Sequence, residues 1–327
     1  MRARRLLSVP AYLLAWGLCL ATAALWLPLS VLVDVLRPGP AVALRSAALV
    51  CVYLSCEVIG LAASAVLWGW RRVARVDEAA WQNAHFRLQA GWGASLFGAT
   101  RHLFGLELAL EGDAALGRGP YLLLMRHAST GDTLLASALV ARPHGMRLRY
   151  VLKRELLWDP CIDIVGQRLP NVFVERFSDD SAREVQRVHA LARGLGPRDA
   201  VLIYPEGSRF SVAKRLRALE RLERAGNAQQ LACARACTHV LPPRLGGTLA
   251  LLDATAEADV VVCAHTGFEG AASLGQIWRG ALVHRTIRVQ FRRIARREIP
   301  VAREARIAWL LDTWRGVDAW IDQHQVV

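Results

Sequence analysis

The chain has 327 residues, 54% of them hydrophobic, and a formal net charge of +13 from 41 basic and 28 acidic residues. This length is sufficient for one domain with a full hydrophobic core plus additional segments. A basic excess favours either a nucleic acid or an anionic membrane surface as partner. Because the sequence has no zinc-finger or RNP-like motif and has two long apolar stretches, we expect a membrane and no nucleic acid.

Residues 11–33 and 46–70 predict two membrane helices. The first stretch has no charged residue and the second has one, Glu57. About 20 apolar residues suffice to cross the hydrocarbon core as a helix. The first stretch is too long for the apolar part of a typical signal peptide, and the second follows it directly. We therefore expect residues 1–76 to form two membrane helices, which either span the bilayer or dip into one leaflet as a hairpin.

The charges around these stretches predict their orientation. Arginines precede the first and follow the second, whereas the linker holds only Arg37 and Arg45. Such flanks stay on the cytoplasmic side, so we expect the rest of the chain to be cytoplasmic. Because Glu57 is costly in lipid, we expect it to make a helix–helix or interfacial contact.

Residues 77–104 place Trp81, Phe86, Trp92 and Phe97 among arginine, glutamine and histidine. This pattern is typical of an amphipathic helix, or a pair of them, at the membrane interface. An ordinary helix that packs on the core fits the pattern equally well.

Residues 105–327 alternate strand and helix patterns. We expect strands at 121–125, 147–152, 171–174, 200–204, 260–264 and 286–291, and a short one at 240–241. Helical patterns occupy 133–140, 181–193, 212–224 and 301–323. Such alternation predicts an α/β fold with a mixed, largely parallel sheet flanked by helices, preceded by the two membrane helices. Functional residues in such folds gather at the carboxyl ends of the strands.

Seven cysteines are present, and Cys233 and Cys237 share a helix face. No second pair completes a zinc pattern, so we expect reduced cysteines and no metal site.

His127 and Asp132 lie five residues apart, directly after the apolar strand pattern at 121–125. A tight strand-to-helix turn there aims an imidazole into a cleft, and a nearby carboxylate fixes its tautomer. Alone, this spacing arises often by chance.

Three further groups follow predicted strands. Arg176 closes the sequence Phe-Val-Glu-Arg, and a guanidinium at that place can bind a phosphate with two hydrogen bonds. Glu206, Gly207, Ser208 and Arg209 form a turn that is a plausible anion-binding loop. The last group is Val-Leu-Pro-Pro-Arg at 240–244.

These four blocks, in this order, resemble the glycerolipid acyltransferase family, whose best-known members are the 1-acyl-glycerol-3-phosphate (lysophosphatidic acid) acyltransferases. The family carries an H-x4-D block, a block ending in Phe-x-x-Arg, an E-G-T-R block and a proline-containing apolar block. The Phe-Ser after the third block and the Pro-Arg-x-x-Gly of the fourth resemble the subgroup that includes lysocardiolipin acyltransferases. The resemblance covers about residues 100–320.

This sequence departs from the family pattern at three positions. Arg126 stands where an asparagine is usual, Asn171 where a glycine is common, and Ser208 where a threonine is usual. Ser208 keeps a hydroxyl. Arg126 is the departure that could alter the loop around His127.

The resemblance implies acyl transfer from a thioester to a hydroxyl. His127 is the expected general base, and Asp132 holds its ring and stabilises the imidazolium. Arg176 and Arg209 are expected to bind the acceptor phosphate, while Glu206 and Ser208 orient the loop and the acceptor. The remaining expected substrate-binding residues are Gly207, through its backbone turn, and Lys153, which is one of only two lysines and lies at a strand end.

The sequence therefore predicts a membrane-bound acyltransferase of the bacterial inner membrane. Its expected substrates are a lysophospholipid, above all 1-acyl-glycerol-3-phosphate, and acyl-CoA or acyl-carrier protein as acyl donor, with no metal or organic cofactor. Another lysolipid acceptor, or a non-catalytic lipid-binding relative, stays open.

Overall fold

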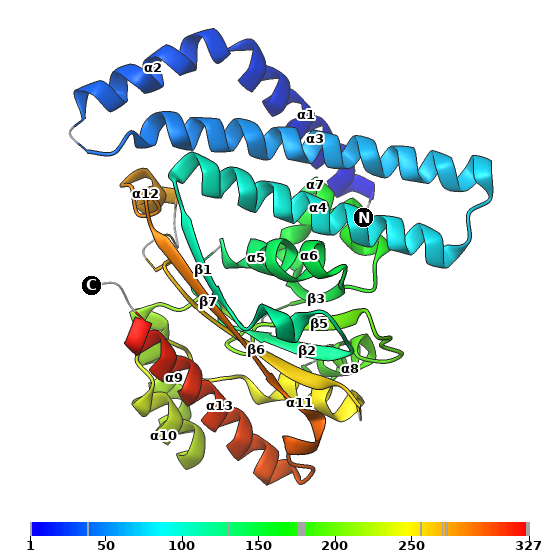
Figure 1. Cartoon of the computed structure of the whole chain (residues 1–327), viewed down its shortest axis with the longest axis vertical. Coiled ribbons are helices and arrows are strands. Elements are labelled where there is room, and N and C mark those ends of the chain that lie inside the picture. The colour runs from blue at the N-terminus through cyan, green and yellow to red at the C-terminus, as the bar shows by residue number, and fades with distance from the viewer. Residues whose placement is uncertain are drawn as a thin grey trace.

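The computed structural model describes residues 2–37, 39–129, 131–175, 181–255, 257–269, 271 and 274–324. Its centre is a seven-stranded sheet in the order β1-β7-β6-β2-β5-β3-β4 (Figure 1). The strands are β1 (Glu107–Glu111), β2 (Tyr121–Met125), β3 (Arg147–Lys153), β4 (Val172–Val174), β5 (Asp199–Ile203), β6 (Asp259–Thr266) and β7 (Thr286–Ile294).

Five neighbouring strands, β6, β2, β5, β3 and β4, run parallel, while β7 is antiparallel to β6 and parallel to β1. The mixed, largely parallel sheet predicted from the sequence is thus confirmed. All residues of β2 and β5 are buried, since helices cover both faces of the sheet. The carboxyl ends of the five parallel strands meet at one edge, and this places the segments that follow them side by side.

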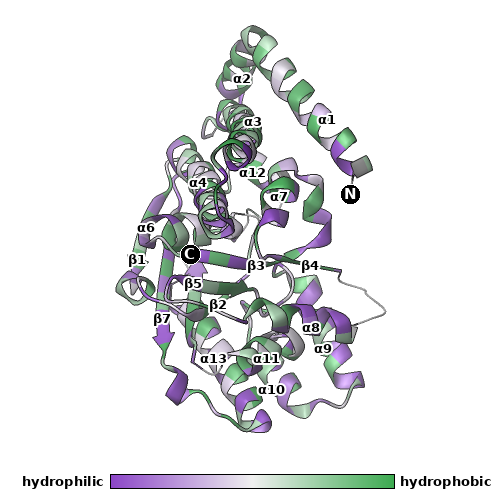
Figure 2. Ribbon diagram, turned by 90° about the vertical axis from the view of Figure 1, so that its right-hand side faces the viewer, coloured by the Kyte–Doolittle hydropathy of each residue, from purple (hydrophilic) through white to green (hydrophobic). Residues whose placement is uncertain are grey.

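Two helical layers sandwich the sheet (Figures 1 and 2). One face carries α4 (Glu78–Phe104), α5 (Asp132–Leu135), a π-helical segment (Ala136–Ala141) and α6 (Arg142–His144). The other face packs against α8 (Ser181–Leu191), α10 (Ala228–Ala236), α11 (Leu245–Ala254) and α13 (Arg303–His324). Helices α7 (Pro160–Ile164), α9 (Val212–Arg224) and α12 (Leu274–Trp278) also follow α4 in the chain.

Three N-terminal helices lie above this sandwich: α1 (Arg2–Ala21), α2 (Ala23–Leu36) and α3 (Val42–Ala74) (Figure 1). The expectation of one continuous helix over 11–33 is wrong, because the chain bends by 70° between α1 and α2. Thr22 stands at the break, and the indole N–H of Trp26 donates to the carbonyl of Cys19 there at 2.8 Å. The carbonyl of Cys19 therefore keeps a hydrogen-bond partner at the break.

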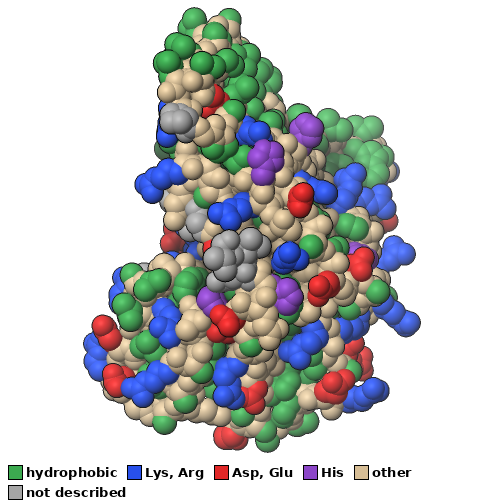
Figure 3. Space-filling view, turned by 60° about the vertical axis from the view of Figure 1, so that its left-hand side comes forward, with side chains coloured by type: hydrophobic (Ala, Val, Ile, Leu, Met, Phe, Trp, Pro, Cys, Tyr) green, Lys and Arg blue, Asp and Glu red, His purple; other side chains and the backbone are tan. Residues whose placement is uncertain are grey.

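Among the described helices, α3 is long and apolar enough to cross a membrane, and the bent pair α1–α2 is a second candidate if it is one broken span. Exposed hydrophobic side chains gather over these helices in Figure 3. They include Leu6, Leu14, Leu25, Leu29, Leu36, Ile59, Val66 and Val73.

The first turn of α1 is tied to α7. Arg4 donates to Asp163 at 2.7 Å and Arg5 donates to it at 3.0 Å. These bonds and charges outweigh burial and lower the pKa of Asp163. At the other end, Asp34 of α2 accepts the N–H groups of Ala43 and Leu44 and so caps α3.

Glu57 makes the helix–helix contact expected for it. Its carboxylate accepts the indole N–H of Trp92 at 3.0 Å and the backbone N–H of Cys161 at 3.1 Å, and its side chain is fully buried. A carboxylate on an apolar helix is thereby joined to α4 and α7.

Residues 78–104 form one helix, α4, which packs between α3 and the rest of the chain. Its buried positions are Trp81, His85, Phe86, Ala90, Gly93, Leu96, Phe97 and Phe104. A Cβ atom at Gly93 would lie 2.5 Å from Ser137 Oγ, so this glycine permits the close approach of α4 to the π-helical segment. The buried face of α4 thus packs on the core, as one of the two interpretations predicted. An interfacial role for the helix stays a prediction.

Most predicted strands lie within a few residues of the observed ones, with two exceptions. Strand β1 was not predicted. The short strand expected at 240–241 is wrong, because those N–H groups donate to the side chains of Asp318 and Glu206. Pro242 and Pro243 follow and have no N–H to offer a sheet.

Candidate active site

The segment after β2 folds tightly around the carboxylate of Asp132. Its Oδ2 atom lies 3.4 Å from His127 Nδ1 and accepts the backbone N–H groups of Ala128 at 2.6 Å and Ser129 at 2.9 Å. Asp132 is fully buried and His127 is 7% exposed. Burial raises the pKa of Asp132, but the bond from His127, the neighbouring imidazoles and the backbone donors outweigh it, and the net shift is downward. The carboxylate thus stays ionised beside the imidazole.

A second histidine, His265 at the end of β6, lies against the same carboxylate. Its Nε2 atom is 3.6 Å from Asp132 Oδ2 and 3.0 Å from the carbonyl oxygen of Arg126. His265 is fully buried. The carboxylate therefore has an imidazole on each of two sides, one following β2 and one ending β6.

Glu206 connects three of the predicted blocks. Its Oε1 accepts the backbone N–H of His127 at 2.8 Å, and its Oε2 accepts that of Leu241 at 2.9 Å. The side chain is 2% exposed, and burial raises its pKa to about 8 while the two backbone donors oppose the rise. Phe210 N–H adds a bond of 2.8 Å to the carbonyl of His127. These bonds connect Glu206 to the His127 loop, and its role in orienting the loop and the acceptor stays a prediction.

The residues around Gly207 form the turn after β5. Gly207 has φ +64°, and a Cβ there would lie 2.7 Å from Arg244 Cδ. The turn therefore needs glycine both for its backbone conformation and for the close approach of the Arg244 side chain. Ser208 is 7% exposed and Arg209 is partly buried. Just before the turn, the ring of Tyr204 stacks on His127 with centroids 4.3 Å apart.

Arg126, which stands where the family usually has asparagine, is buried and paired with groups inside the fold. It is 1% exposed, forms an ion pair with Glu269, and donates to the carbonyls of His265 at 2.5 Å and His239 at 3.1 Å. The guanidinium therefore holds the end of β2 against the end of β6 and the segment before Val240.

The remaining predicted residues lie at the same sheet edge or outside the described residues. Lys153 ends β3, whose neighbour β5 leads into the Gly207 turn. Arg176 follows β4 but is outside the described residues. The sheet thus brings together the first, third and fourth blocks and puts Lys153 at the same edge.

Three residues of this site were not predicted from the sequence: His265, Tyr204 and Glu269. The signal for His265 was available, since it directly follows the predicted strand 260–264 and functional residues gather at such ends. Tyr204 and Glu269 carry no comparable signal, because stacking and ion pairing depend on which loops meet.

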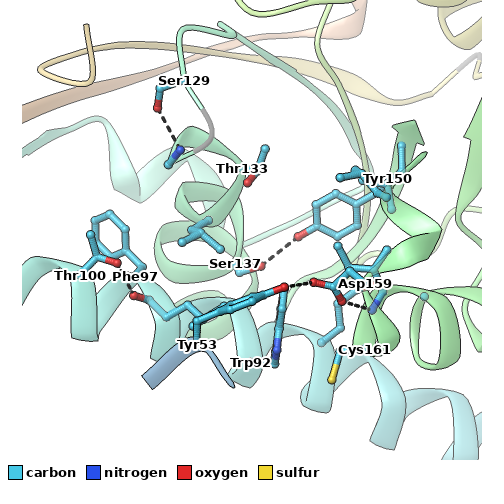
Figure 4. Close-up of a pocket in the computed structure, with 18 of the residues that line it drawn as sticks. Tyr53, Trp92, Phe97, Thr100, Ser129, Thr133, Ser137, Tyr150, Asp159 and Cys161 are labelled. Carbon is cyan, nitrogen blue, oxygen red and sulfur yellow. Dashed lines mark hydrogen bonds between the residues drawn. The ribbon is translucent and has the colours of Figure 1, made fainter. Parts of the chain in front are cut away.

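A cavity of about 600 Å³ extends from this site toward the N-terminal helices (Figure 4). Ser129, Gly131 and Tyr204 line it beside the His127 loop, and Tyr53 and Trp92 line it beneath α3 and α4. Its wall is predominantly apolar, and two pairs of its polar side chains bond to one another. Tyr53 donates to Asp159 at 2.8 Å, and the hydroxyls of Ser137 and Tyr150 are 3.2 Å apart.

No group of three or more histidine, cysteine, aspartate or glutamate residues that could hold a metal ion occurs within the described ranges. The seven cysteines, all of them described, are free thiols.

Residues 107–245, which hold all four blocks, match the model of the Acyltransferase family. This part of the chain is therefore similar to the Acyltransferase family. The predicted resemblance to glycerolipid acyltransferases is confirmed.

The chain also has relatives among curated proteins and solved structures. The chain is 26% identical over 216 residues to 1-acyl-sn-glycerol-3-phosphate acyltransferase epsilon of Mus musculus, covering 63% of this chain and 58% of that protein. The chain therefore matches little more than half the length of this relative. The crystal structure of the 1-acyl-sn-glycerophosphate (LPA) acyltransferase PlsC from Thermotoga maritima matches 86% of this chain and 99% of its own, with a TM-score of 0.55 and 13% identity. The structural match supports the fold.

Proposed function

We propose that this protein transfers an acyl chain from a thioester to the free hydroxyl of a lysophospholipid, above all 1-acyl-glycerol-3-phosphate. The observation that carries the proposal is the cavity of about 600 Å³ that joins the His127 loop to the space beneath α3 and α4. An apolar cavity beside a histidine–carboxylate pair suits an acyl chain whose reactive end must lie near a base. Both named relatives act on an acylated glycerophosphate, according to their names.

In this proposal His127 is the general base. Its Nδ1 faces Asp132 Oδ2 at 3.4 Å, so Nε2 is the nitrogen that takes the proton from the acceptor hydroxyl. The hydroxyl oxygen then attacks the thioester carbonyl carbon and gives a tetrahedral oxyanion. When this intermediate collapses, the C–S bond breaks and the thiolate takes the proton from His127 Nε2. Asp132 stabilises the imidazolium between the two proton transfers.

The oxyanion needs hydrogen-bond donors close to His127. The backbone N–H groups of His127, Ala128 and Ser129 already donate to Glu206 and Asp132. The backbone N–H of Gly207 likewise donates to the carbonyl of Tyr204 at 2.9 Å, so the His127 loop and the turn at 207–209 both stay candidate sources of the donors. We assign the acceptor phosphate to Arg209 and Arg176, with Lys153 contributing positive charge at the same edge of the sheet.

The N-terminal helices suit a protein that takes its lipid substrates from a bilayer. Apolar side chains are exposed along α1, α2 and α3, and residues of α3 line the cavity. We propose attachment to the bacterial inner membrane with the Acyltransferase domain on the cytoplasmic side, and acyl-CoA or acyl-carrier protein as donor. A site at the bilayer surface accepts acyl chains without their full transfer into water.

The test uses membranes that contain the wild type, His127→Ala or the control His102→Ala, whose histidine is exposed on α4. Each is given radiolabelled acyl-CoA with a panel of lysophospholipids, and then acyl-carrier protein as donor. We expect a labelled two-chain product with the wild type and the control, and none with His127→Ala.

Two outcomes contradict parts of the proposal. If product formed only from lysolipids other than 1-acyl-glycerol-3-phosphate, the proposed acceptor would be wrong and the proposed reaction would stand. If no product formed with any acceptor and either donor, the assignment as an enzyme would be wrong, and a non-catalytic lipid-binding relative would be favoured.

A further inference from the structure

We propose that His265 is a positioning residue that acts on the reaction through Asp132 and so completes a His265–Asp132–His127 unit. This inference rests on the proposed function of His127 and Asp132. It adds a residue from β6, a strand outside the four sequence blocks.

Side chain and backbone contacts between Arg126 and His265 are reciprocal. Arg126 donates from its guanidinium to the carbonyl of His265 at 2.5 Å, and His265 Nε2 lies 3.0 Å from the carbonyl of Arg126. The backbone N–H of Arg126 also donates to Cys263 O at 3.1 Å, which extends the pairing of β2 with β6. These three bonds fix the place from which the His127 loop departs.

The partner of Nε2 determines the tautomer of His265. A carbonyl oxygen accepts hydrogen bonds only, so the proton is on Nε2, and Nδ1 is the unprotonated nitrogen. Nδ1 is buried without a hydrogen-bond partner among the described residues. A second proton would sit there without a partner, so His265 remains neutral. Burial also lowers its pKa.

The Nε2–H of the neutral ring bonds to the carbonyl of Arg126, and this positive end of the ring dipole lies 3.6 Å from Asp132 Oδ2. The charged groups around it are Asp132 from α5, Arg126 from the end of β2 and Glu269 from the segment after β6. Arg126 and Glu269 form an ion pair with each other, so the carboxylate of Asp132 is the group that the dipole stabilises. The positive end of this dipole disfavours protonation of Asp132. Through Asp132 it also disfavours protonation of the His127–Asp132 pair, which we call the dyad.

The key variant is His265→Leu, which removes both the dipole and the bond to Arg126 O. We expect kcat to fall by about 10- to 100-fold with little change in KM, since the dyad shifts while the substrate contacts remain. The acid limb of the pH–rate profile should move to higher pH by about half a unit, because the carboxylate loses a stabilising dipole. His265→Gln keeps an N–H near the Nε2 position and should restore most of both properties.

A matched control separates this role from simple loss of a buried histidine. His85 of α4 is also fully buried, with its Nδ1 2.9 Å from the carbonyl of Trp81. His85→Leu should lower the thermal stability and leave the acid limb unmoved. Equal pH profiles for His265→Leu, His85→Leu and the wild type would overturn the inference.

A second measurement does not depend on turnover. In protein labelled with ¹³C at aspartate carboxyls, the Asp132 signal should titrate at higher pH in His265→Leu than in the wild type, and His265→Gln should resemble the wild type. If the wild type acylates no acceptor, the proposed function fails, and this titration alone decides the role of His265. An unchanged Asp132 titration in His265→Leu would refute it.

Discussion

Glu206 accepts the backbone N–H of His127 at 2.8 Å, so the third sequence block positions the first. The other oxygen of Glu206 binds the backbone of Leu241 in the fourth block. One buried carboxyl group therefore joins three segments that follow different strands or loops. This arrangement explains why a glutamate belongs to a site in which His127 and Asp132 carry the proposed proton transfer.

We predict that Glu206→Gln is destabilising and lowers activity. An amide has one acceptor oxygen, so its NH₂ group must face one of the two backbone N–H donors, and that donor stays unpaired. A buried unpaired donor costs about 1–3 kcal/mol. Thermal unfolding in detergent, with the exposed Glu220→Gln on α9 as control, measures this loss. Equal stability of the two variants would mean that the Glu206 bonds contribute little.

Gly207→Ala should lose both stability and activity. An alanine at φ +64° is strained by about 1–2 kcal/mol, and its Cβ would also displace Arg244. Gly226→Ala is the matched control, because Gly226 has φ +66° and no atom within 4 Å of the added Cβ. We expect similar losses of stability from the backbone strain, and loss of acyl transfer in Gly207→Ala alone. If both variants had wild-type activity, the Gly207 turn would not be part of the active site.

The stability of the protein should fall below neutral pH in a way that depends on His265. Its folded pKa is lowered by burial, whereas an unfolded histidine binds a proton near pH 6.5. Below that pH the unfolded state takes up a proton that the folded state refuses, so stability decreases as pH falls, by as much as about 1.4 kcal/mol per pH unit.

His265→Gln removes this dependence and is the comparison protein. Unfolding by urea from pH 7.5 to 5.5 should show the wild type losing stability relative to the variant. Glu206 and other buried groups contribute slopes of their own, which are common to both proteins and cancel in the difference. Parallel stability curves would show that the folded state protonates His265 as readily as the unfolded state.

Leu134→Phe should shift the preferred acyl chain toward shorter lengths. Leu134 lines the cavity beside the His127 loop, so a larger ring reduces the space for the chain. Overpacking costs about 1–3 kcal/mol, which corresponds to a loss of roughly 5- to 150-fold in kcat/KM for long chains. A series of acyl-CoA lengths measures the shift. Leu216→Phe on the exposed side of α9 is the control and should leave the chain-length profile unchanged.

Local sequence patterns were sufficient for most elements of the sheet. The apolar run 121–125 and the run 200–204 predict buried central strands because both faces of those strands are covered. The pattern failed at 240–241, where side chains of Glu206 and Asp318 take the N–H groups that a neighbouring strand would otherwise take. It also failed at Thr22, since an apolar stretch predicts the length of a helix and not a bend within it.

For the site, the sequence determined the residue types and their order along the chain: a histidine and an aspartate five apart, then an arginine, then an acidic glycine turn. It also determined the apolar N-terminal segment. Only the tertiary structure decided which of these side chains meet. His265 and Asp132 are 133 positions apart in the chain, and they meet because β6 pairs with β2 in a parallel register. Likewise, the cavity exists only where α3 and α4 pack over the sheet, because a cavity is formed by several elements together and no single segment encodes it.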